Sequence, residues 1–482
     1  MTDHMTPWGT YLVFEVSSAE PDADPNWVDF TDRVLNIGQL LETWLGRDSE
    51  LDKPEPGGMS VQMLNRDDAL TPGNPTSDYY PWWKQARRFR IREIIGYQGF
   101  DLADGYLEIP EVQIRTQDPD DAESDITLSV TAVDILGRLQ SASRFGCLLT
   151  EYIKFNAGPS LVAHWPMTEV SGPFRSITGP AMPTVSEPAV LRWGDPTAQS
   201  GTALLTPAAT AGPRGDDGTY PQYDMEVHTT SGLLRPARSI ATYATIPPGT
   251  MTVVAGQVMT AVFWVRSSWS ATDSEADPLL IRYTTFPTDG VIALVKQDGS
   301  DGTWLLEVTG GTSASFATTA VAPTDRWTLI GIRWGFTPNT VELWVDGTRT
   351  VGTLSFVPAG SARMDDFYMP ESRFDGSIAQ VQVYIGDAED YTFEMFQAQR
   401  RVGLEGFDRQ TTGERINTVL DYAGFPSGRR DIDAGTAVMQ PLSLAGKRPL
   451  DPLEEAVETE QGRLFAQGGR VVFHDRTRIH DV

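Results

Sequence analysis

Two carboxylates in Val341-Glu-Leu-Trp-Val-Asp346 come nearest, in this chain, to an acid–base pair for cleaving a glycosidic bond. Enzymes that cleave such a bond with retention hold two carboxyl groups about 5 Å apart. Alternation along a strand would place Glu342 and Asp346 on one face, but Asp346 precedes Gly347 and is expected to begin a turn. The pair is therefore a weak match to a glycosidase site.

The five histidines offer no clearer chemistry. They stand at positions 4, 164, 228, 474 and 480, without the i, i+4 spacing that holds a metal ion on a helix. His474 is expected to be a strand residue rather than a base. The chain also contains no Gly-x-Ser-x-Gly elbow, phosphate-binding loop or His-Glu-x-x-His motif. We therefore predict that the protein is not an enzyme.

Binding is better supported than cleavage. The rings of Trp269, Tyr283 and Tyr368 could cover the C–H side of a sugar while their edges stay hydrated. Core packing explains each of the three equally well or better. Asp298 and Asp301 lie in an acidic stretch whose oxygens suit calcium. A solvated loop is the simpler interpretation, so we predict that no metal or cofactor is required.

Two adjacent tryptophans, Trp82 and Trp83, follow Pro81. Successive side chains of an extended segment point to opposite sides, so we expect that the two indoles cannot both face one core. Exposed apolar groups that lie together typically mark a contact between molecules. We therefore predict that Trp82 and Trp83 contribute to assembly between subunits.

The candidate residues named above are expected to lie in more than one domain, because the chain is long. The chain has 482 residues, 40% of them hydrophobic, which suits two to four domains. No apolar run approaches the roughly 18 to 20 residues that span a bilayer, and the N-terminus lacks a secretory pattern. We expect the protein to be made and kept in a cytoplasm, or to leave it by lysis. The lone cysteine, Cys147, cannot form an internal disulfide and is expected to be a small buried hydrophobe.

Almost all of the formal net charge of −27 lies in residues 1–400. Residues 1–160 hold 27 acidic and 13 basic groups, and residues 161–400 hold 25 and 14. A negative surface repels phosphate backbones, so we predict no sequence-specific binding of nucleic acid. An acidic lining could help DNA to slide through a conduit, although charge that serves solubility explains the excess more simply.

Up to about residue 140 the chain shows short alternating apolar runs, separated by Gly, Pro and Asp, which are typical of a small antiparallel barrel or sandwich. Four segments in this region, in order, resemble the minor tail proteins of long-tailed phages. They are Trp27-Val-Asp-Phe-Thr-Asp-Arg-Val34, a Gly-Gly turn into a strand that ends Leu64-Asn-Arg-Asp67, an aromatic loop at Pro81, and Ala132-Val-Asp-Ile-Leu-Gly-Arg138. In that family the region is a tail-tube-like β-barrel of the baseplate hub.

The middle of the chain resembles a different family. Four segments, in order, are similar to strands of a laminin-G/concanavalin-A-like jelly roll: His164-Trp-Pro-Met-Thr-Glu169, Met259–Val265, Arg326–Trp334 and Val341–Thr348. The last two are expected to pair, with Asp346-Gly347 supplying the positive backbone angle that a hairpin turn needs. Residues 171–249 depart from the family pattern.

Beyond residue 390 the pattern changes to helices, expected over 391–401, 412–424 and 449–460, followed by a hairpin about Gly468-Gly469. This order is similar to the continuation of a phage tail hub protein. In that family the chain usually continues, so we expect a shortened variant or a missing tail.

The predicted fold is therefore mainly β: a tail-tube-like, hub-like β-barrel domain over 1–158, an inserted jelly-roll β-sandwich over 159–390, and a small α+β continuation of the hub over 391–482. The jelly roll is expected to be a module inserted into a scaffold whose two flanks belong to one assembly-forming body.

The resemblance implies a structural component of a phage tail tip. It implies a homotrimer that contacts other tail-tip and tail-tube proteins and presents the jelly roll to a host cell-surface glycan. The protein would be made in the host cytoplasm and located in the tail tip of the virion, and it would not insert into a membrane. One alternative is a free carbohydrate-binding or glycan-cleaving jelly-roll protein. Another is a jelly roll that decorates the tip and binds nothing.

Overall fold

The chain folds into two compact units. The computed structural model describes residues 11–35, 42–44, 54–108, 111–114, 126–168, 177, 203–225, 242–245, 252–253, 256–267, 279–284, 292–297, 303–309, 314–321, 326–335, 340–353, 362–363, 366–369 and 376–480. Unit 1 contains Met1–Phe145, Asp408–Gln440 and Gly446–Val482, and unit 2 contains Gly146–Phe407 and Pro441–Ala445. Unit 1 is thus built from both ends of the sequence.

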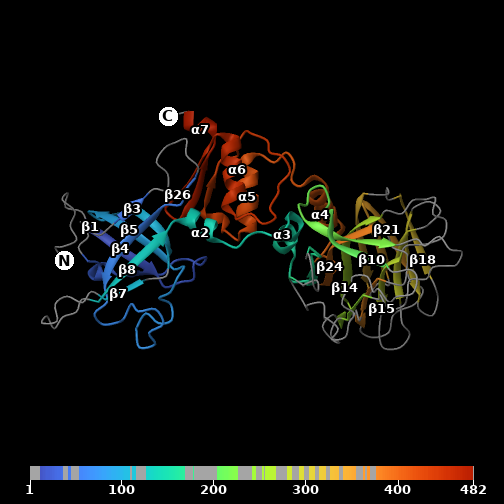
Figure 1. Ribbon diagram of the computed structural model, residues 1–482, viewed down its shortest axis with the longest axis horizontal. Coiled ribbons are helices and arrows are strands. Elements are labelled where there is room, and N and C mark those ends of the chain that lie inside the picture. The colour runs from blue at the N-terminus through green and yellow to red at the C-terminus, as the bar shows by residue number, and fades with distance from the viewer. Residues whose placement is uncertain are drawn as a thin grey trace. The chain divides into compact units, whose positions relative to one another are not determined.

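The N-terminal part of unit 1 is an antiparallel sheet that curls into a barrel (Figure 1). Its strand order is β2-β1-β5-β6-β8-β4-β3, with β7 paired to β8. The strands are β1 (Tyr11–Ser17), β2 (Trp27–Asp29), β3 (Glu42–Trp44), β4 (Gly58–Leu64), β5 (Arg88–Ile95), β6 (Gln98–Leu107), β7 (Glu111–Ile114) and β8 (Ile126–Val133). After the one-turn helix η1 (Thr31–Arg33), Val34 bridges Met63 of β4, and the Leu35 amide donates to the Gln62 carbonyl at 2.9 Å. These contacts bring the sheet back onto itself.

Alternation of side chains along the strands fills the barrel. Met59, Val61 and Met63 of β4 are buried on the inner side, as expected from their spacing. Strand β8 ends at Val133, and the carboxylate of the next residue, Asp134, accepts a hydrogen bond from the Gly137 amide at 2.9 Å. Asp134 thereby caps helix α2 (Ile135–Ser141) and changes the backbone from strand to helix within one residue.

The C-terminal part of unit 1 is a small α+β segment. A three-stranded sheet has the order β25-β27-β26, and helices α5 and α6 contact each other. Its elements are α5 (Thr412–Tyr422), η3 (Ser427–Arg429), β25 (Arg430–Ile432), α6 (Leu450–Glu460), β26 (Arg463–Gln467), β27 (Arg470–His474) and α7 (Arg476–His480). Thr411 and Glu414 form a reciprocal capping box at the start of α5. The helices and hairpin lie where the sequence predicts them.

The N-terminal and C-terminal parts of unit 1 are hydrogen-bonded to each other at the residues that border unit 2 in the sequence. The Phe145 amide donates to the Lys447 carbonyl at 2.9 Å, and the Gly446 amide donates to the Phe145 carbonyl at 3.0 Å. This ladder pairs residues about 300 positions apart in the sequence. The middle of the chain is therefore an insertion between two segments that fold together.

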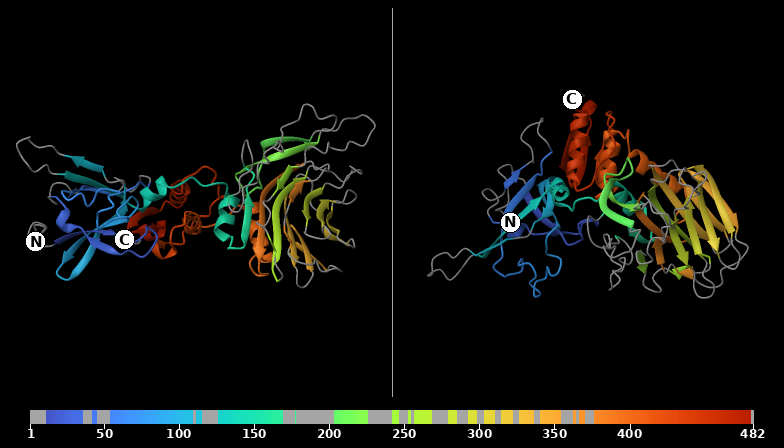
Figure 2. Two further views of the ribbon diagram at one scale, coloured as in Figure 1. Left: turned by 90° about the horizontal axis from the view of Figure 1, so that it is seen from below. Right: turned by 45° about the vertical axis from the view of Figure 1, so that its right-hand side comes forward.

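Unit 2 is a sandwich of two antiparallel sheets (Figure 2). The larger sheet has the order β10-β11-β24-β14-β19-β20-β21, with β9 on β24, and the smaller has the order β12-β23-β15-β16-β17-β18. The larger sheet consists of β9 (Leu161–Trp165), β10 (Ala203–Ala211), β11 (Thr219–Met225), β14 (Val258–Ser267), β19 (Trp327–Gly335), β20 (Thr340–Val345), β21 (Thr348–Thr353) and β24 (Gly376–Gly386). The smaller consists of β12 (Thr242–Thr245), β15 (Leu279–Thr284), β16 (Ile292–Gln297), β17 (Thr303–Thr309), β18 (Ala314–Val321) and β23 (Asp366–Met369). Strands β13 (Thr252–Val253) and β22 (Ala362–Arg363) form a separate two-stranded sheet.

The predicted hairpin between β20 and β21 is confirmed. Val345 pairs with Thr348, so Asp346 and Gly347 form a two-residue turn with φ angles of 49° and 119°. Both angles lie in the left-handed region, where glycine and aspartate are favoured. The expectation of a mainly β chain with a curled barrel, a jelly-roll-like sandwich and an α+β segment is also confirmed.

Two helices cover the outer face of the larger sheet: α3 (Leu148–Asn156) and α4 (Phe393–Glu405). Helix α4 packs closely because a Cβ atom at Gly403 would stand 2.1 Å from the Trp264 ring of β14. Unit 2 includes α3 and α4, so the expected boundaries at 158/159 and 390/391 both fall inside it.

A short strap, Pro441–Ala445, also belongs to unit 2. The Asp217 carboxylate accepts hydrogen bonds from the Ser443 hydroxyl at 2.9 Å, from the Leu444 amide, and from the Ala445 amide at 2.6 Å. The same carboxylate accepts a hydrogen bond from the Leu148 amide at 3.2 Å, so Asp217 links the strap to the start of α3.

Candidate functional site

The sequence-predicted sugar-binding aromatics are only partly placed. Tyr283 lies on β15 and Tyr368 on β23, two neighbouring strands of the smaller sheet, where Arg282 pairs with Tyr368. Tyr283 is thus one position out of register with Tyr368, and successive positions of a strand belong to opposite faces of a sheet, so the backbone does not place the two candidates in one site. Trp269 lies outside the described residues, as do the calcium candidates Asp298 and Asp301.

The prediction that Trp82 and Trp83 form an exposed pair requires correction. Trp83 is 4% exposed and Trp82 is partly buried, and both pack against the barrel core. Their rings lie 5.2 Å and 6.2 Å from the ring of Phe30. Residues 81 and 82 lie in a turn and Trp83 follows it outside any strand, so the argument from alternating directions does not apply. Both indoles serve the fold of the barrel.

The two carboxylates that most resemble a glycosidase pair, Glu342 and Asp346, accept hydrogen bonds within the sandwich. Glu342 is buried, accepts two hydrogen bonds from Arg349 at 2.7 and 2.8 Å, and accepts one from the Trp344 indole at 2.7 Å. Asp346 accepts from the Leu329 amide at 3.2 Å and lies in the turn. Both carboxylates therefore stabilise the β19–β21 meander.

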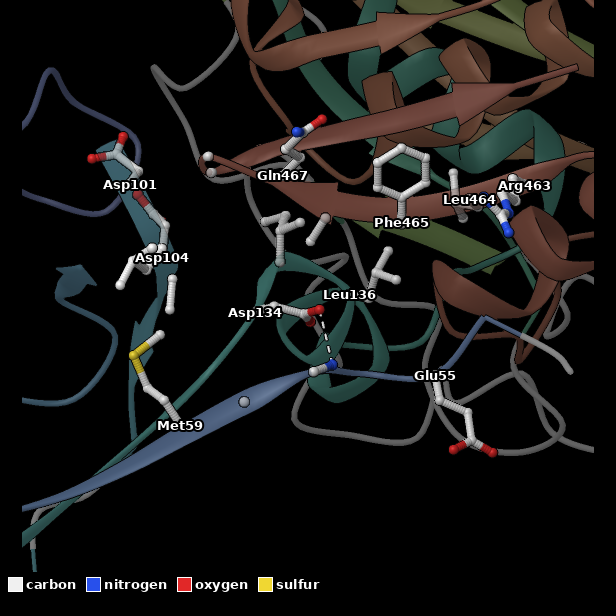
Figure 3. Close-up of a pocket in the computed structure, with 18 residues that line it drawn as sticks. Glu55, Met59, Asp101, Asp104, Asp134, Leu136, Arg463, Leu464, Phe465 and Gln467 are labelled. Atoms are coloured by element: carbon white, nitrogen blue, oxygen red, sulfur yellow. Dashed lines mark hydrogen bonds between the residues drawn. The ribbon is translucent and has the colours of Figure 1, made fainter. Parts of the chain in front are cut away.

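One pocket of unit 1 has a volume of about 540 Å³. Figure 3 shows the residues that line it. The pocket lies between β6, the start of α2 and the edge strand β26. The Asp134 carboxylate accepts from the Gly57 amide at 2.8 Å as well as capping α2, and Asp104 forms an ion pair with Arg88 at 2.7 Å. Asp101 faces Arg92 at 3.3 Å. Three of the four carboxylates that line the pocket therefore form hydrogen bonds or ion pairs within unit 1.

Unit 2 contains a buried polar cluster between α3 and β24. Gln380, on β24, donates to Cys147 Sγ and to Thr150 Oγ1, both at 3.0 Å, and its Oε1 lies 2.8 Å from His164 Nε2. Burial lowers the pKa of His164 to about 4, although the contact with Gln380 acts in the opposite direction. Cys147 is buried, as predicted. The cluster fixes α3 on the sheet with neutral partners.

A second pocket, of about 330 Å³, opens beside this cluster between α3, β24 and α4. Three tyrosines line it: Tyr152, Tyr384 and Tyr391. The rings of Tyr384 and Tyr391 stack with centroids 4.0 Å apart. Burial raises the pKa of both, and that of Tyr152 too. All three therefore stay neutral phenols at physiological pH.

Polar groups lie among the tyrosines of this pocket. The Tyr391 hydroxyl donates to Gln399 Oε1 at 2.8 Å, and Gln399 is 1% exposed. Sequence reasoning missed this site because its residues come from three separated segments. Helix α3 was not predicted, although Leu148, Leu149 and Ile153 are spaced as on a buried helix face.

The part of the chain that the structure describes contains no group of three or more His, Cys, Asp or Glu side chains that could hold a metal ion. Among the same residues, no helix is both long and apolar enough to cross a membrane.

Comparisons with known proteins give only slight likenesses. No protein-family model matches the chain, and no curated protein matches it in sequence. Among solved structures, the CBM40 module of the Ruminococcus gnavus IT-sialidase bound to α2,3 sialyllactose is 15% identical, covering 30% of this chain and 83% of that chain with a TM-score of 0.23.

Two further solved structures are similar to the same slight degree. A heptameric SAP-like pentraxin of Limulus polyphemus is 12% identical, covering 32% of this chain and 72% of that chain, with a TM-score of 0.23. The Trypanosoma rangeli sialidase in complex with sialic acid is 10% identical, covering 83% and 62%, with a TM-score of 0.28. Likenesses of this size carry no functional inference.

Proposed function

We propose that the protein is a structural component of the tail tip of a long-tailed phage. In this proposal unit 1 assembles with other tail proteins as a trimer of this chain, and unit 2 is displayed for attachment to a glycan of the host surface. The protein acts by assembly and adhesion, not by catalysis. The proposal extends the resemblance of residues 8–140 and 391–482 to hub proteins, on either side of a jelly roll.

The observation that supports the proposal best is that the two flanks form one body. Arg429, after α5, donates to the Tyr106 hydroxyl of β6 and to the Pro21 carbonyl at 3.3 Å. Its Nε donates to the carbonyl of Gly469, in the turn of the β26–β27 hairpin, at 3.0 Å. One guanidinium thus joins the barrel to two elements of the C-terminal segment. A scaffold interrupted by a sandwich is what the proposed role requires.

The decisive experiment is to locate the protein in phage particles. Antibodies against unit 2 should label the tail tip of intact particles produced by cells that carry the gene, and the protein should remain with the particles through a density gradient. The purified chain, of 53.0 kDa, should form a species of three times that mass. Protein that stays entirely in the particle-free fraction would contradict the proposal.

A free carbohydrate-binding protein is the second candidate, and the tyrosine-lined pocket of unit 2 favours it. This candidate predicts glycan binding without particle labelling. A glycan-cleaving variant of the same candidate predicts that the protein releases sugars from cell-wall material and that Glu342→Gln abolishes the release. The contacts of Glu342 with Arg349 and Trp344 give this variant little support.

A further inference from the structure

The tyrosine-lined pocket of unit 2 contains a buried hydrogen-bond donor without an acceptor. Tyr391 donates to Gln399 Oε1, which orients the amide so that Nε2 is directed away from Tyr391. Among the described residues Gln399 Nε2 has no hydrogen-bond partner, although the side chain is almost fully buried. Buried polar groups are nearly always satisfied. An oxygen atom of a bound molecule would complete this site.

The lining indicates the class of that molecule. The residues around the pocket are Tyr152, Ile153, Asn156, Ala157, Tyr384, Tyr391, Thr392, Glu394, Met395, Ala398 and Gln399. Glu394 is the one charged side chain among them and is exposed. Among the residues that the structure describes, no lysine or arginine lines the pocket, so the charged side chain that a carboxylated or phosphorylated ligand would meet there is that of Glu394, which repels it.

The size of the pocket and the side chains on its surface restrict the class of ligand further. A volume of about 330 Å³ is at the small end of the range for ligand pockets, roughly 300 to 1,000 Å³. Tyrosine rings present apolar faces that suit the C–H side of a pyranose. A neutral sugar ring combines an apolar face with hydroxyl oxygens that can accept from Gln399.

We propose that the pocket between α3, β24 and α4 binds one neutral pyranose unit of a glycan, with the Gln399 amide donating to a sugar oxygen. The inference rests on the attachment role proposed for unit 2 and names its ligand class. The site lies on the helices that cover the larger sheet, whereas Tyr283 and Tyr368 lie on the smaller sheet.

The test uses the full chain and a panel of methyl glycosides. Neutral probes are the α- and β-methyl pyranosides of glucose, galactose, mannose, rhamnose and N-acetylglucosamine, and 3′-sialyllactose is the anionic probe. Binding is measured by saturation-transfer NMR and by titration calorimetry. At least one neutral probe should bind saturably, and 3′-sialyllactose should bind more weakly.

The chain supplies a matched control on the same helix. Gln397 also carries a buried Nε2 atom without a partner among the described residues, but it lies against Gly347 and outside the pocket. Gln399→Met should weaken binding by about tenfold or more, because it removes the donor while keeping the volume. Gln397→Met should leave the affinity unchanged. Ala398→Met, which fills the pocket without removing a polar group, should also abolish binding.

Three results would overturn the inference. They are no saturable binding of any neutral probe, equal losses in the Gln397 and Gln399 variants, or a preference for 3′-sialyllactose. Each variant is first checked for a wild-type unfolding temperature, and Ala398→Met provides the test if Gln399→Met does not fold. Particle labelling is independent of these measurements, so failure of sugar binding and failure of the tail-tip proposal can be told apart.

Discussion

Arg429 and Tyr106 are 323 positions apart in the sequence, yet the guanidinium of one donates a hydrogen bond to the hydroxyl of the other. The same guanidinium lies 5.8 Å from the centroid of the Tyr106 ring and 5.3 Å from that of Phe425. The barrel and the terminal segment therefore share a connection that neither could complete alone.

Replacing Arg429 by alanine should destabilise unit 1. The change removes hydrogen bonds to Tyr106, Pro21 and Gly469, of which Tyr106 and Gly469 are buried, for a loss of about 2 to 4 kcal/mol in the free energy of unfolding. Chemical denaturation, followed by hydrogen exchange of unit 1 peptides, measures the loss. Arg448→Ala, at an exposed position, is the control. Equal effects of the two changes would show that Arg429 does not join the segments.

The hairpin turn between β26 and β27 offers a matched glycine pair. Gly468 and Gly469 have φ angles of 55° and 70°, so alanine at either position should cost about 1 kcal/mol in backbone strain. A Cβ atom at Gly468 meets nothing within 4 Å, whereas one at Gly469 would lie 2.5 Å from Arg88 Nη2. Arg88 is held in a buried ion pair with Asp104 at 2.7 Å and cannot move freely.

Gly469→Ala should therefore lower the free energy of unfolding of unit 1 by about 1 kcal/mol or more beyond the loss in Gly468→Ala. Urea denaturation of the two variants side by side gives the difference. If both variants lose the same stability, the hairpin turn does not pack on the Arg88–Asp104 pair.

Glu460 should make unit 1 sensitive to acid. Burial opposes its ionisation, but hydrogen bonds from the Ala437 amide and from Thr412 and Thr436 outweigh burial and hold its pKa at about 2. The folded state therefore binds its proton less readily than the unfolded state. Stability from this group is complete above about pH 4.5 and is lost as the pH falls toward 2.

Glu460→Gln should remove that dependence and lower stability at pH 7 by about 2 kcal/mol. Thermal unfolding between pH 2 and 7 measures both effects. Glu458→Gln, at an exposed position of the same helix, should keep the acid dependence of the parent. An unchanged acid profile in Glu460→Gln would refute the assignment.

His164 should make unit 2 sensitive to acid at a higher pH. Burial lowers the pKa of its imidazole to about 4, although the hydrogen bond with Gln380 acts in the opposite direction. The unfolded chain binds the proton more readily than the folded state, so stability is complete above about pH 6.5 and falls as the pH drops toward 4. Hydrogen exchange of peptides from α3 and β24 at pH 4.5 and 7 reports this loss.

The variant His164→Gln should show a smaller difference between the two pH values than the parent. His474→Gln, on the half-exposed end of β27 in unit 1, is the control and should leave the exchange of α3 and β24 unchanged. A difference that persists fully in His164→Gln would assign the acid sensitivity to another group.

Much of the fold could be predicted from local patterns. The alternation of Met59, Val61 and Met63 and the Asp346-Gly347 turn are local signals, and each is realised as predicted. The alternation rule fails for Trp82 and Trp83 because neither lies in a strand, and both rings pack against one core. Local patterns could not reveal the pocket around Gln399, which depends on segments more than 200 residues apart coming together.

Exchange of the sandwich between scaffolds, by recombination or in the laboratory, must move two pieces of chain. If unit 2 were transferred as residues 146–407 alone, the strap 441–445 would stay in the original scaffold. Asp217 Oδ2 would then lose its donors at Ser443, Leu444 and Ala445, while Oδ1 would keep the hydrogen bond from the Leu148 amide. Transplants that carry the strap should fold, and those that omit it should not.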